Sequence, residues 1–323
     1  MSPKTIERVR KAAEQLGYRK DLIASSLQTG KNAVFGLILA DFRRGIYAPL
    51  VESFQRYSIE HQYNTVLYYV NPNHDDLEHV IHLMQQQRVS GATFISAAAT
   101  AKLHDHLSDL LERGIAVNTL DRDILGQQID RVVFDHQKAG RDLTEHLISL
   151  GHRKIVFITY KGIKGTPAGR LKGYQEAMRE ANLQEIVVTE DKPVAQTAGD
   201  EMMLSYHRIH QVWNQLDEPT AVIGTNDNFA LGAFHALRER GYDIPNDISI
   251  AGFDDLSATM VVPQLTSMRS PMSQSGKKLA ELLLQRAQGK NEPAKTFTLN
   301  YELIKRGTTA PARTTERFMS RAD

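Results

Sequence analysis

The chain has 323 residues, which is long for one domain and comfortable for two. Hydrophobic residues make up 41% of it and charged residues 24%, as in ordinary globular proteins, and no apolar run is long enough to cross a bilayer. The absence of cysteine excludes disulfides, a thiol nucleophile and cysteine-ligated metal, and it fits a cytoplasmic protein.

Basic residues are concentrated at the N-terminus. Residues 1–32 carry seven lysines and arginines against three acidic residues, a net charge of +4 that leaves −3 for the remainder of a chain whose total is +1. A basic N-terminal segment on a mildly acidic remainder suggests that the segment contacts phosphate groups. A solvated helix face has the same composition, and charge alone leaves both interpretations open.

The N-terminal segment predicts two short helices. Ser2 is suited to cap the first helix and Pro3 to occupy its first position, apolar residues follow at helical spacing, and Gly17 ends the run. A second helix is expected over 21–28, followed by a polar linker. The segment lacks the basic flank, apolar stretch and cleavage site of a signal peptide.

From residue 33 onward, expected strands and helices alternate. The expected strands are 34–39, 65–70, 92–96, 115–120, 131–134, 154–159, 186–189, 221–225 and 248–252. The expected helices are 49–62, 75–87, 102–113, 137–150, 168–182, 199–216 and 228–240. Strands separated by helices of this length form βαβ units and parallel sheets. Because there are too many strands for one small sheet, the sequence predicts an α/β fold with two doubly wound parallel-sheet domains.

Several short segments, taken in their order and spacing, carry a family resemblance. They are Ser2-Pro3-Lys4-Thr5, Ala24-Ser25-Ser26-Leu27-Gln28-Thr29-Gly30, Gly151-His152-Arg153-Lys154, Gly169-Arg170-Leu171-Lys172-Gly173, Asn226-Asp227, Ile244-Pro245-Asn246-Asp247 with Gly252-Phe253-Asp254-Asp255, and Arg306-Gly307-Thr308-Thr309. Any one of them is weak evidence. Together they resemble the lac repressor/galactose repressor family of transcriptional regulators, whose effector core is periplasmic-binding-protein-like.

The resemblance implies a division of the chain. The expected parts are 1–19 as a partial DNA-binding headpiece (third helix only), 20–32 as hinge helix and linker, 33–135 with 267–291 as the N-terminal core subdomain, 136–266 with 292–312 as the C-terminal core subdomain, and 313–323 as a tail. Three crossovers would join the subdomains, and a strand near 266–269 would return the chain to the first one. Family members carry a helix-turn-helix pair upstream of this segment, so we expect an N-terminally truncated headpiece.

The implied function is ligand-responsive transcriptional regulation, as a repressor. A small sugar or sugar derivative would bind in the cleft between the subdomains, and a homodimer would couple its binding to operator DNA, if the full headpiece exists. The alternative is a DNA-independent ligand sensor or a sugar-binding protein that lacks operator recognition. By resemblance, the DNA-contacting hinge residues would be Ala24, Ser25 and Leu27, although without the upstream helices packing of Leu27 against its two-fold mate is the favoured interpretation.

The effector-binding residues are carried over from the resemblance and from their positions near strand ends, where open α/β sheets bind ligands. They are Asp121, Arg170, Asn226, Asp254, Tyr47, Lys164 and Thr166. Carboxylates accept hydroxyl donors, a guanidinium donates to ring or hydroxyl oxygens, and an aromatic face stacks on a sugar.

Plainer roles are open for these residues and their neighbours. Asp227 is expected chiefly as a helix N-cap, and Asp255 as a solvated or turn-capping residue. Asp121 could form a loop ion pair with Arg122, and Tyr47 could belong to the core.

Other chemistries lack a motif in this sequence. The histidines do not fall into a metal-binding spacing, so we expect no metal. Neither a Walker loop nor GxGxxG follows a strand, and GxSxG is absent, so we expect no cofactor and no enzyme activity. Because no apolar run is long enough to cross a bilayer, we also expect no membrane partner.

Overall fold

The computed structural model describes residues 2, 5, 7, 8, 11, 12 and 15 and the ranges 32–39, 45–70, 76–95, 103–121, 128–190, 198–290 and 292–313. Ser2 Oγ accepts the amide of Thr5 at 3.3 Å, as an N-cap does, whereas Ala24, Ser25 and Leu27 lie outside the described residues. No helix within the described ranges is long and apolar enough to span a membrane.

The chain divides into two compact units. Unit 1 comprises 1–40, 54–131 and 277–295, and unit 2 comprises 41–53, 132–276 and 296–323. The chain therefore passes between the units near residues 40, 53, 131, 276 and 295, and the expectation of three crossovers stays a prediction.

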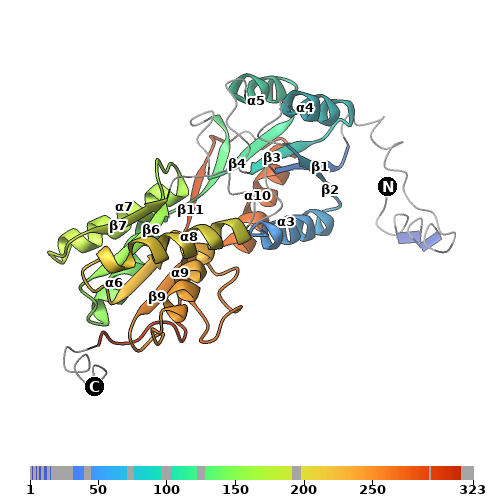
Figure 1. Cartoon of the computed structure of the whole chain (residues 1–323). Helices are drawn as coiled ribbons and strands as arrows, with labels where there is room; N and C mark the ends of the chain where they lie inside the picture. The colour runs from blue at the N-terminus through green and yellow to red at the C-terminus, as the bar shows by residue number, and fades with distance from the viewer. Residues whose placement is uncertain are drawn as a thin grey trace, which may run out of the picture. The chain divides into compact units, whose positions relative to one another are not determined.

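The first sheet has the strand order β11-β5-β4-β3-β1-β2 (Figure 1). Its strands are β1 (Val34–Leu39), β2 (Asn64–Tyr69), β3 (Gly91–Ile95), β4 (Ala116–Leu120), β5 (Asp130–Phe134) and β11 (Thr296–Leu299). The accompanying helices are α3 (Ala48–Glu60), α4 (Leu77–Gln86), α5 (Leu103–Glu112) and α10 (Met272–Ala287). β1 pairs in parallel with both β2 and β3, so the strand order reverses direction beside β1.

The second sheet repeats this arrangement with the order β12-β10-β9-β8-β6-β7. Its strands are β6 (Ile155–Tyr160), β7 (Ile186–Glu190), β8 (Ala221–Gly224), β9 (Ser249–Asp254), β10 (Thr266–Arg269) and β12 (Glu302–Ile304). The helices are α6 (His136–Ser149), α7 (Thr166–Glu180), α8 (Ala198–Val212) and α9 (Asp227–Glu239), with the short 3-10 helix η2 (Trp213–Gln215). All its strand pairs are parallel except β10–β12, and the predicted fold of two doubly wound parallel-sheet domains is confirmed.

Strand β6 shows how the apolar pattern builds two cores in unit 2. Because alternate side chains of a strand point to opposite faces, Val156 and Ile158 pack under α8 and α9, whereas Ile155 and Phe157 pack under α6 and α7. All four side chains are fully buried, so β6 reads as a continuous apolar run. The helices seen on the two sides of this sheet in Figure 1 cover these two faces.

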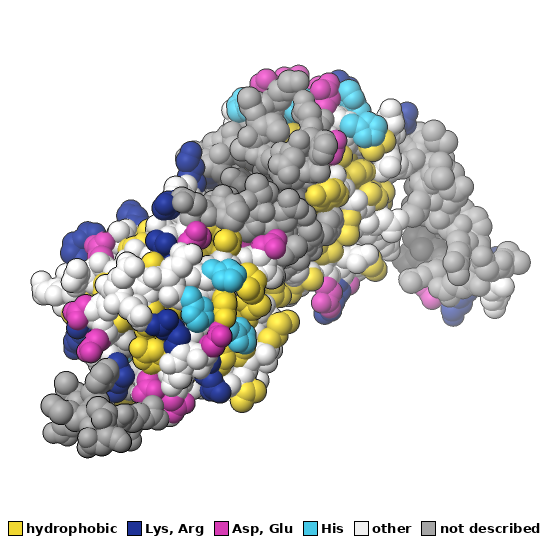
Figure 2. All heavy atoms as spheres, viewed as in Figure 1, with side chains coloured by type: hydrophobic (Ala, Val, Ile, Leu, Met, Phe, Trp, Pro, Cys, Tyr) yellow, Lys and Arg dark blue, Asp and Glu magenta, His cyan; other side chains and the backbone are white. Residues whose placement is uncertain are grey.

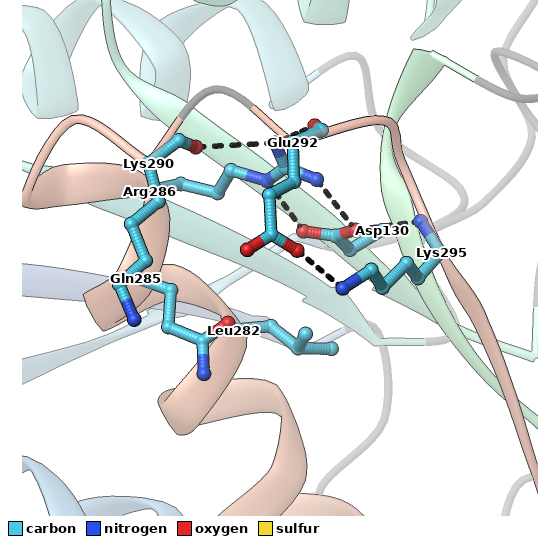
Figure 3. Close-up of a pocket in the computed structure, with 7 residues that line it drawn as sticks. All are labelled: Asp130, Leu282, Gln285, Arg286, Lys290, Glu292 and Lys295. Carbon is cyan, nitrogen blue, oxygen red and sulfur yellow. Dashed lines mark hydrogen bonds and ion pairs between the residues drawn. The ribbon is translucent and has the colours of Figure 1, made fainter.

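An ion pair fastens the last helix of unit 1 to its sheet. Arg286 of α10 donates from Nε and Nη2 to the two oxygens of buried Asp130 at 2.8 and 2.9 Å. Its guanidinium also donates to backbone oxygens of Lys290, Glu292 and Pro293. Figure 3 shows these groups closing on one another around a small polar pocket. Since the guanidinium of Arg286 is occupied by these intramolecular hydrogen bonds, the residues around this pocket have a structural role.

One predicted connection is wrong. The strand at Thr266–Arg269 was expected to return the chain to the first subdomain, but β10 pairs in parallel with β9 of the second sheet, Thr266 opposite Ala251. The segment after α10 also forms two strands, β11 in the first sheet and β12 in the second. A four-residue strand is too short for its sequence pattern to specify a sheet. Pairing with the edge of β9 places β10 in the second sheet.

Helices α6 and α7 approach closely because of glycine. A Cβ built on Gly173 would lie 2.0 Å from Gln137 O and 2.6 Å from Arg141 N, so no side chain fits there. We expect Gly173→Ala to separate the helices and lower the free energy of unfolding by about 3 kcal/mol, despite the better helix propensity of alanine. Urea denaturation followed by circular dichroism measures the loss.

The matched control is Lys172→Ala, an exposed position on the same helix, which should change stability by less than about 0.5 kcal/mol. Equal denaturation midpoints for Gly173→Ala and the wild type would contradict the close-packing account.

Candidate functional site

The strand order of the second sheet marks where a ligand belongs. β6 pairs with β7 on one side and β8 on the other, so the connections leaving β6 and β8 run in opposite directions. Open α/β sheets bind ligands outside the carboxyl ends of the strands at such a switch point. The first residues of α7 and α9, which follow β6 and β8, are therefore placed at the candidate site.

Arg170 is the central residue of this edge. Its side chain, 4% exposed, donates from Nη2 to Asp254 Oδ1 at 2.5 Å and from Nη1 to Thr225 O at 2.8 Å. The guanidinium lies 4.6 Å from the centroid of the Phe253 ring. Burial alone would lower the pKa of Arg170, but the negative charge of Asp254 and the Tyr301 hydroxyl raise it above its ordinary value, so the cation is permanent.

A chain of hydrogen bonds leads away from Arg170. Its Nη2 also donates to Tyr301 Oη at 3.1 Å, and that hydroxyl lies 2.9 Å from His136 Nδ1. His136 Nε2 is 3.2 Å from Thr166 Oγ1. Because Arg170 can only donate, the hydroxyl of Tyr301 accepts from it and is able to donate to His136. The structure thus connects three of the predicted residues, Arg170, Asp254 and Thr166, within one network.

Three residues of this region lie near passages of the chain between the units. His136 follows the passage near residue 131, and Tyr301 follows the one near 295. Ser270 precedes the passage near 276 and donates to Asp254 Oδ1 at 3.2 Å. The network around Arg170 therefore includes residues near the passages at 131, 276 and 295.

The backbone at the end of β9 separates two neighbouring carboxylates. Asp254 has φ 98° and Asp255 φ 54°, backbone conformations that residues other than glycine rarely adopt. Asp254 pairs with Arg170, whereas Asp255 accepts from Arg269 Nε at 2.7 Å and Arg306 Nη1 at 2.6 Å. The expectation that Asp255 is solvated or caps a turn is wrong, since its side chain is 4% exposed and held by two arginines.

Asp227 is not the N-cap of α9. That position belongs to Asn226, whose side chain accepts the Phe229 amide at 3.0 Å. Asp227 Oδ2 accepts the amides of Leu256 and Ser257, at 2.8 and 3.2 Å. The carboxylate therefore shapes the turn after β9, which sequence spacing could not reveal because its partners lie about thirty residues away.

Burial raises the pKa of Asp227 to about 7, and the charge of Asp254 adds to the rise. Hydrogen bonds from Ser267 and from the two amides oppose it without cancelling it. A buried carboxyl that titrates near neutrality makes this edge sensitive to pH.

The amide of Asn226 is fixed by a second buried carboxylate. Asn226 Nδ2 donates to Glu201 Oε2 at 3.0 Å, and Asn228 Nδ2 donates to the same atom at 2.9 Å. Tyr160 donates to Glu201 Oε1 at 2.7 Å. Glu201 is fully buried at the first turn of α8. Sequence analysis missed Glu201, and an acidic residue in a helix's first turn gave no signal beyond an ordinary helix start.

The remaining predicted residues are not joined to this network by the hydrogen bonds described above. Lys164 is exposed in the β6–α7 loop, and Tyr47 is half-buried directly before α3. Asp121, at the end of β4 in unit 1, has φ 56°. Ligand contact by these three residues stays a prediction. Among the described residues, no group of three or more acidic or histidine side chains is arranged to hold a metal ion.

A two-unit, doubly wound α/β protein with polar side chains gathered at a switch point is a ligand-binding core of the periplasmic-binding-protein-like class. The family model for the periplasmic binding protein-like domain matches residues 144–309. Catabolite control protein A of Priestia megaterium is 30% identical over 291 residues, which cover 88% of this chain and 83% of that protein.

Solved structures agree on the fold. The Lac repressor bound to ONPG in its repressed state is 24% identical with a TM-score of 0.76, covering 96% of this chain and 92% of that one. A LacI family transcriptional regulator from Enterococcus faecium with bound ribose is 23% identical with a TM-score of 0.73, covering 87% and 100%. The chain belongs to the lac repressor family of transcriptional regulators, and it is accordingly a regulator and not an enzyme.

The pKa of Asp227 predicts a pH dependence of stability. Its folded-state value, about 7, lies above the ordinary 3.8, so the stabilisation is fully present below pH 3.8 and is lost as pH rises through 7. The Asp227→Asn variant carries no charge, keeps an oxygen for the amides of Leu256 and Ser257, and can donate from its NH2 group to Ser267 Oγ in place of the bond that Asp227 accepts. Relative to the wild type, it should gain about 3 kcal/mol of stability between pH 5 and pH 8, measured by urea denaturation across that range.

His152 titrates in the same window with the opposite sign, since burial lowers its pKa to about 4. Its stabilisation is lost as pH falls from 6.5, but it is common to both proteins and cancels in their difference. A stability difference that stays constant from pH 5 to pH 8 would rule out the raised pKa of Asp227.

Proposed function

We propose that this regulator binds a small sugar-like effector at the carboxyl edge of the second sheet and couples its binding to operator DNA. The observation that carries the proposal is the network of Arg170, Asp254 and Tyr301 at the switch point. Family membership supports an effector-controlled regulator, and the ribose bound to the Enterococcus faecium relative favours a sugar as ligand.

The chemistry of the edge supports a polyhydroxylated ligand. Asp254, with a side chain 14% exposed, accepts hydroxyl donors, and the Asn226 amide retains one N–H beyond the one given to Glu201. Thr166 and Lys164 extend this surface along the β6–α7 connection. Asp121 and Tyr47 remain part of the proposal as further contacts to the same effector.

Coupling would run through three of the connecting segments. A ligand hydroxyl that takes over a bond of Asp254 changes the hold on Ser270 and Tyr301, and thereby favours one arrangement of the connections. In the proposal the regulator works in the cytoplasm as a repressor, and the hinge residues Ala24, Ser25 and Leu27 contact DNA.

We also propose a homodimer. Exposed apolar side chains in unit 2 support it, because Met260 is 76% and Val262 87% exposed, and Met203 and Leu256 are also partly exposed. Figure 2 shows hydrophobic side chains among histidines over α8 and α9, in the unit that carries these residues. Large apolar side chains in such numbers are typical of a protein interface.

Ligand binding is tested by isothermal titration with ribose, galactose, glucose and cellobiose. For a sugar that binds the wild type, Asp254→Ala should weaken affinity about 10- to 100-fold, because a charged hydrogen-bond acceptor is removed. Arg170→Lys should weaken it similarly, since lysine cannot bond Thr225, Asp254 and Tyr301 together.

The matched controls are Asp217→Ala and Arg179→Lys, which change exposed residues of unit 2 and should leave affinity unchanged. Unaltered affinity in both site variants would remove this edge as the effector site, and a wild-type protein that binds none of the sugars would remove the sugar proposal.

The dimer is tested by light scattering after size exclusion. Placing a charge at the most exposed apolar position, Val262→Asp, should shift the mass from two chains toward one, because an unpaired carboxylate would be buried in the interface. Lys172→Asp on α7 serves as the control and should stay dimeric. A monomeric wild type, or a fully dimeric Val262→Asp variant, would contradict this interface.

A further inference from the structure

The charges at the carboxyl edge of the second sheet decide which kind of sugar it accepts. Among the described residues, Arg170 is the one lysine or arginine that is buried. Asp254 already neutralises it at 2.5 Å, and Asp227 and Glu201 add two buried carboxyl groups. The negative charge of Asp254 helps to raise the pKa of Asp227. Glu201 accepts a hydrogen bond from Asn226, the residue after Thr225. The positive charge of Arg170 is therefore already neutralised before any ligand binds.

The two other arginines nearby are also committed. Arg269 and Arg306 both donate to Asp255, and Arg269 lies 3.4 Å from Glu302 as well. Arg306 gives a further bond to Leu265 O at 2.8 Å. A phosphate monoester needs donors that are free to turn toward it, and these guanidinium groups are held by carboxylates.

The hydrogen-bonding capacity that is left over suits hydroxyl groups. Both bonds that Asp254 accepts from Arg170 and Ser270 go to Oδ1, so Oδ2 can accept from a ligand. A sugar hydroxyl donates to that oxygen, whereas a phosphate oxygen would repel it. The ligand class favoured here thus brings donors and no negative charge.

Three buried polar atoms on one face of the sheet also favour a ligand that carries hydroxyl groups. Arg170 Nε, Thr159 Oγ1 and Thr225 Oγ1 lack hydrogen-bond partners among the described residues. Thr159 and Thr225 each follow one residue after the paired Ile158 and Gly224, so they are neighbours on the same face. That face packs against α6 and α7, where Arg170 bonds Thr225 O. A hydroxyl group or a water molecule, able both to donate and to accept, satisfies such a set.

We propose that the effector is an uncharged polyhydroxylated sugar and that phosphorylated sugars are excluded because Asp254 already neutralises Arg170 and Asp255 holds Arg269 and Arg306. The inference rests on the proposed function, whose site it specifies. Lys164, exposed in the β6–α7 loop, is the cation through which a phosphate ester would have to be held instead.

The experiment compares matched pairs by isothermal titration on the full chain, ribose with ribose 5-phosphate and glucose with glucose 6-phosphate. The neutral sugar of a binding pair should have a Kd lower by about tenfold or more than its phosphate ester. Equal or tighter binding of the ester overturns the inference but leaves the effector site standing, and loss of that binding in Lys164→Gln would locate the phosphate. Binding of neither member in both pairs removes the proposed sugar site and this inference with it.

A second measurement uses inorganic phosphate as the probe and needs no knowledge of the sugar. At equal ionic strength, phosphate should not raise the melting temperature of the wild type above that in sodium chloride. Asp254→Asn frees the charge of Arg170 and should gain a saturable rise with phosphate, whereas Asp217→Asn, an exposed control, should not. Saturable stabilisation of the wild type, or no gain in a folded Asp254→Asn variant, overturns the inference.

Discussion

The buried ion pair between Arg170 and Asp254 is the interaction on which the carboxyl edge of the second sheet depends. Removing a guanidinium from water costs several kcal/mol, and one partner alone does not offset that cost. Arg170 is tolerated because Thr225 O, Asp254 and Tyr301 accept its terminal donors and the Phe253 ring lies against it. Losing one partner would leave a buried charge, so the pair holds the edge in one geometry.

That geometry is tied to the chain's connections between its units. Ser270, Tyr301 and His136 each lie beside a different crossing, and each bonds directly or through one neighbour to the ion pair. The hydrogen-bond network consequently includes unit 2 residues that lie near three of the places where the chain passes between the units. In the proposed function, a ligand that competes for these bonds would have differential contacts with those segments, which is what a conformational response requires.

Much of the fold follows from the sequence because strand and helix periodicities are local. Arg170 and Asp254 could be named as candidates from the sequence, since both match a family segment, Asp254 ends a strand and Arg170 lies near the start of a helix. Tyr301 and His136 could not, because one lies between two short strands, the other begins a helix, and they meet across 165 positions. The roles of Asp227 and Asp255 were misassigned for the same reason, as their partners are distant in sequence.

Three aspartates of one chemistry, Asp227, Asp254 and Asp255, thus have three environments. The partners described for Asp227 are uncharged hydrogen-bond donors, and burial raises its pKa to about 7. Asp254 is held by the single guanidinium of Arg170, whereas Asp255 is held by Arg269 and Arg306. The positive φ angles of 98° and 54° at the end of β9 send the adjacent carboxylates to different partners. The backbone turn, rather than residue type, therefore decides which arginines each carboxylate meets, and in the proposed site it leaves Asp254 to the effector.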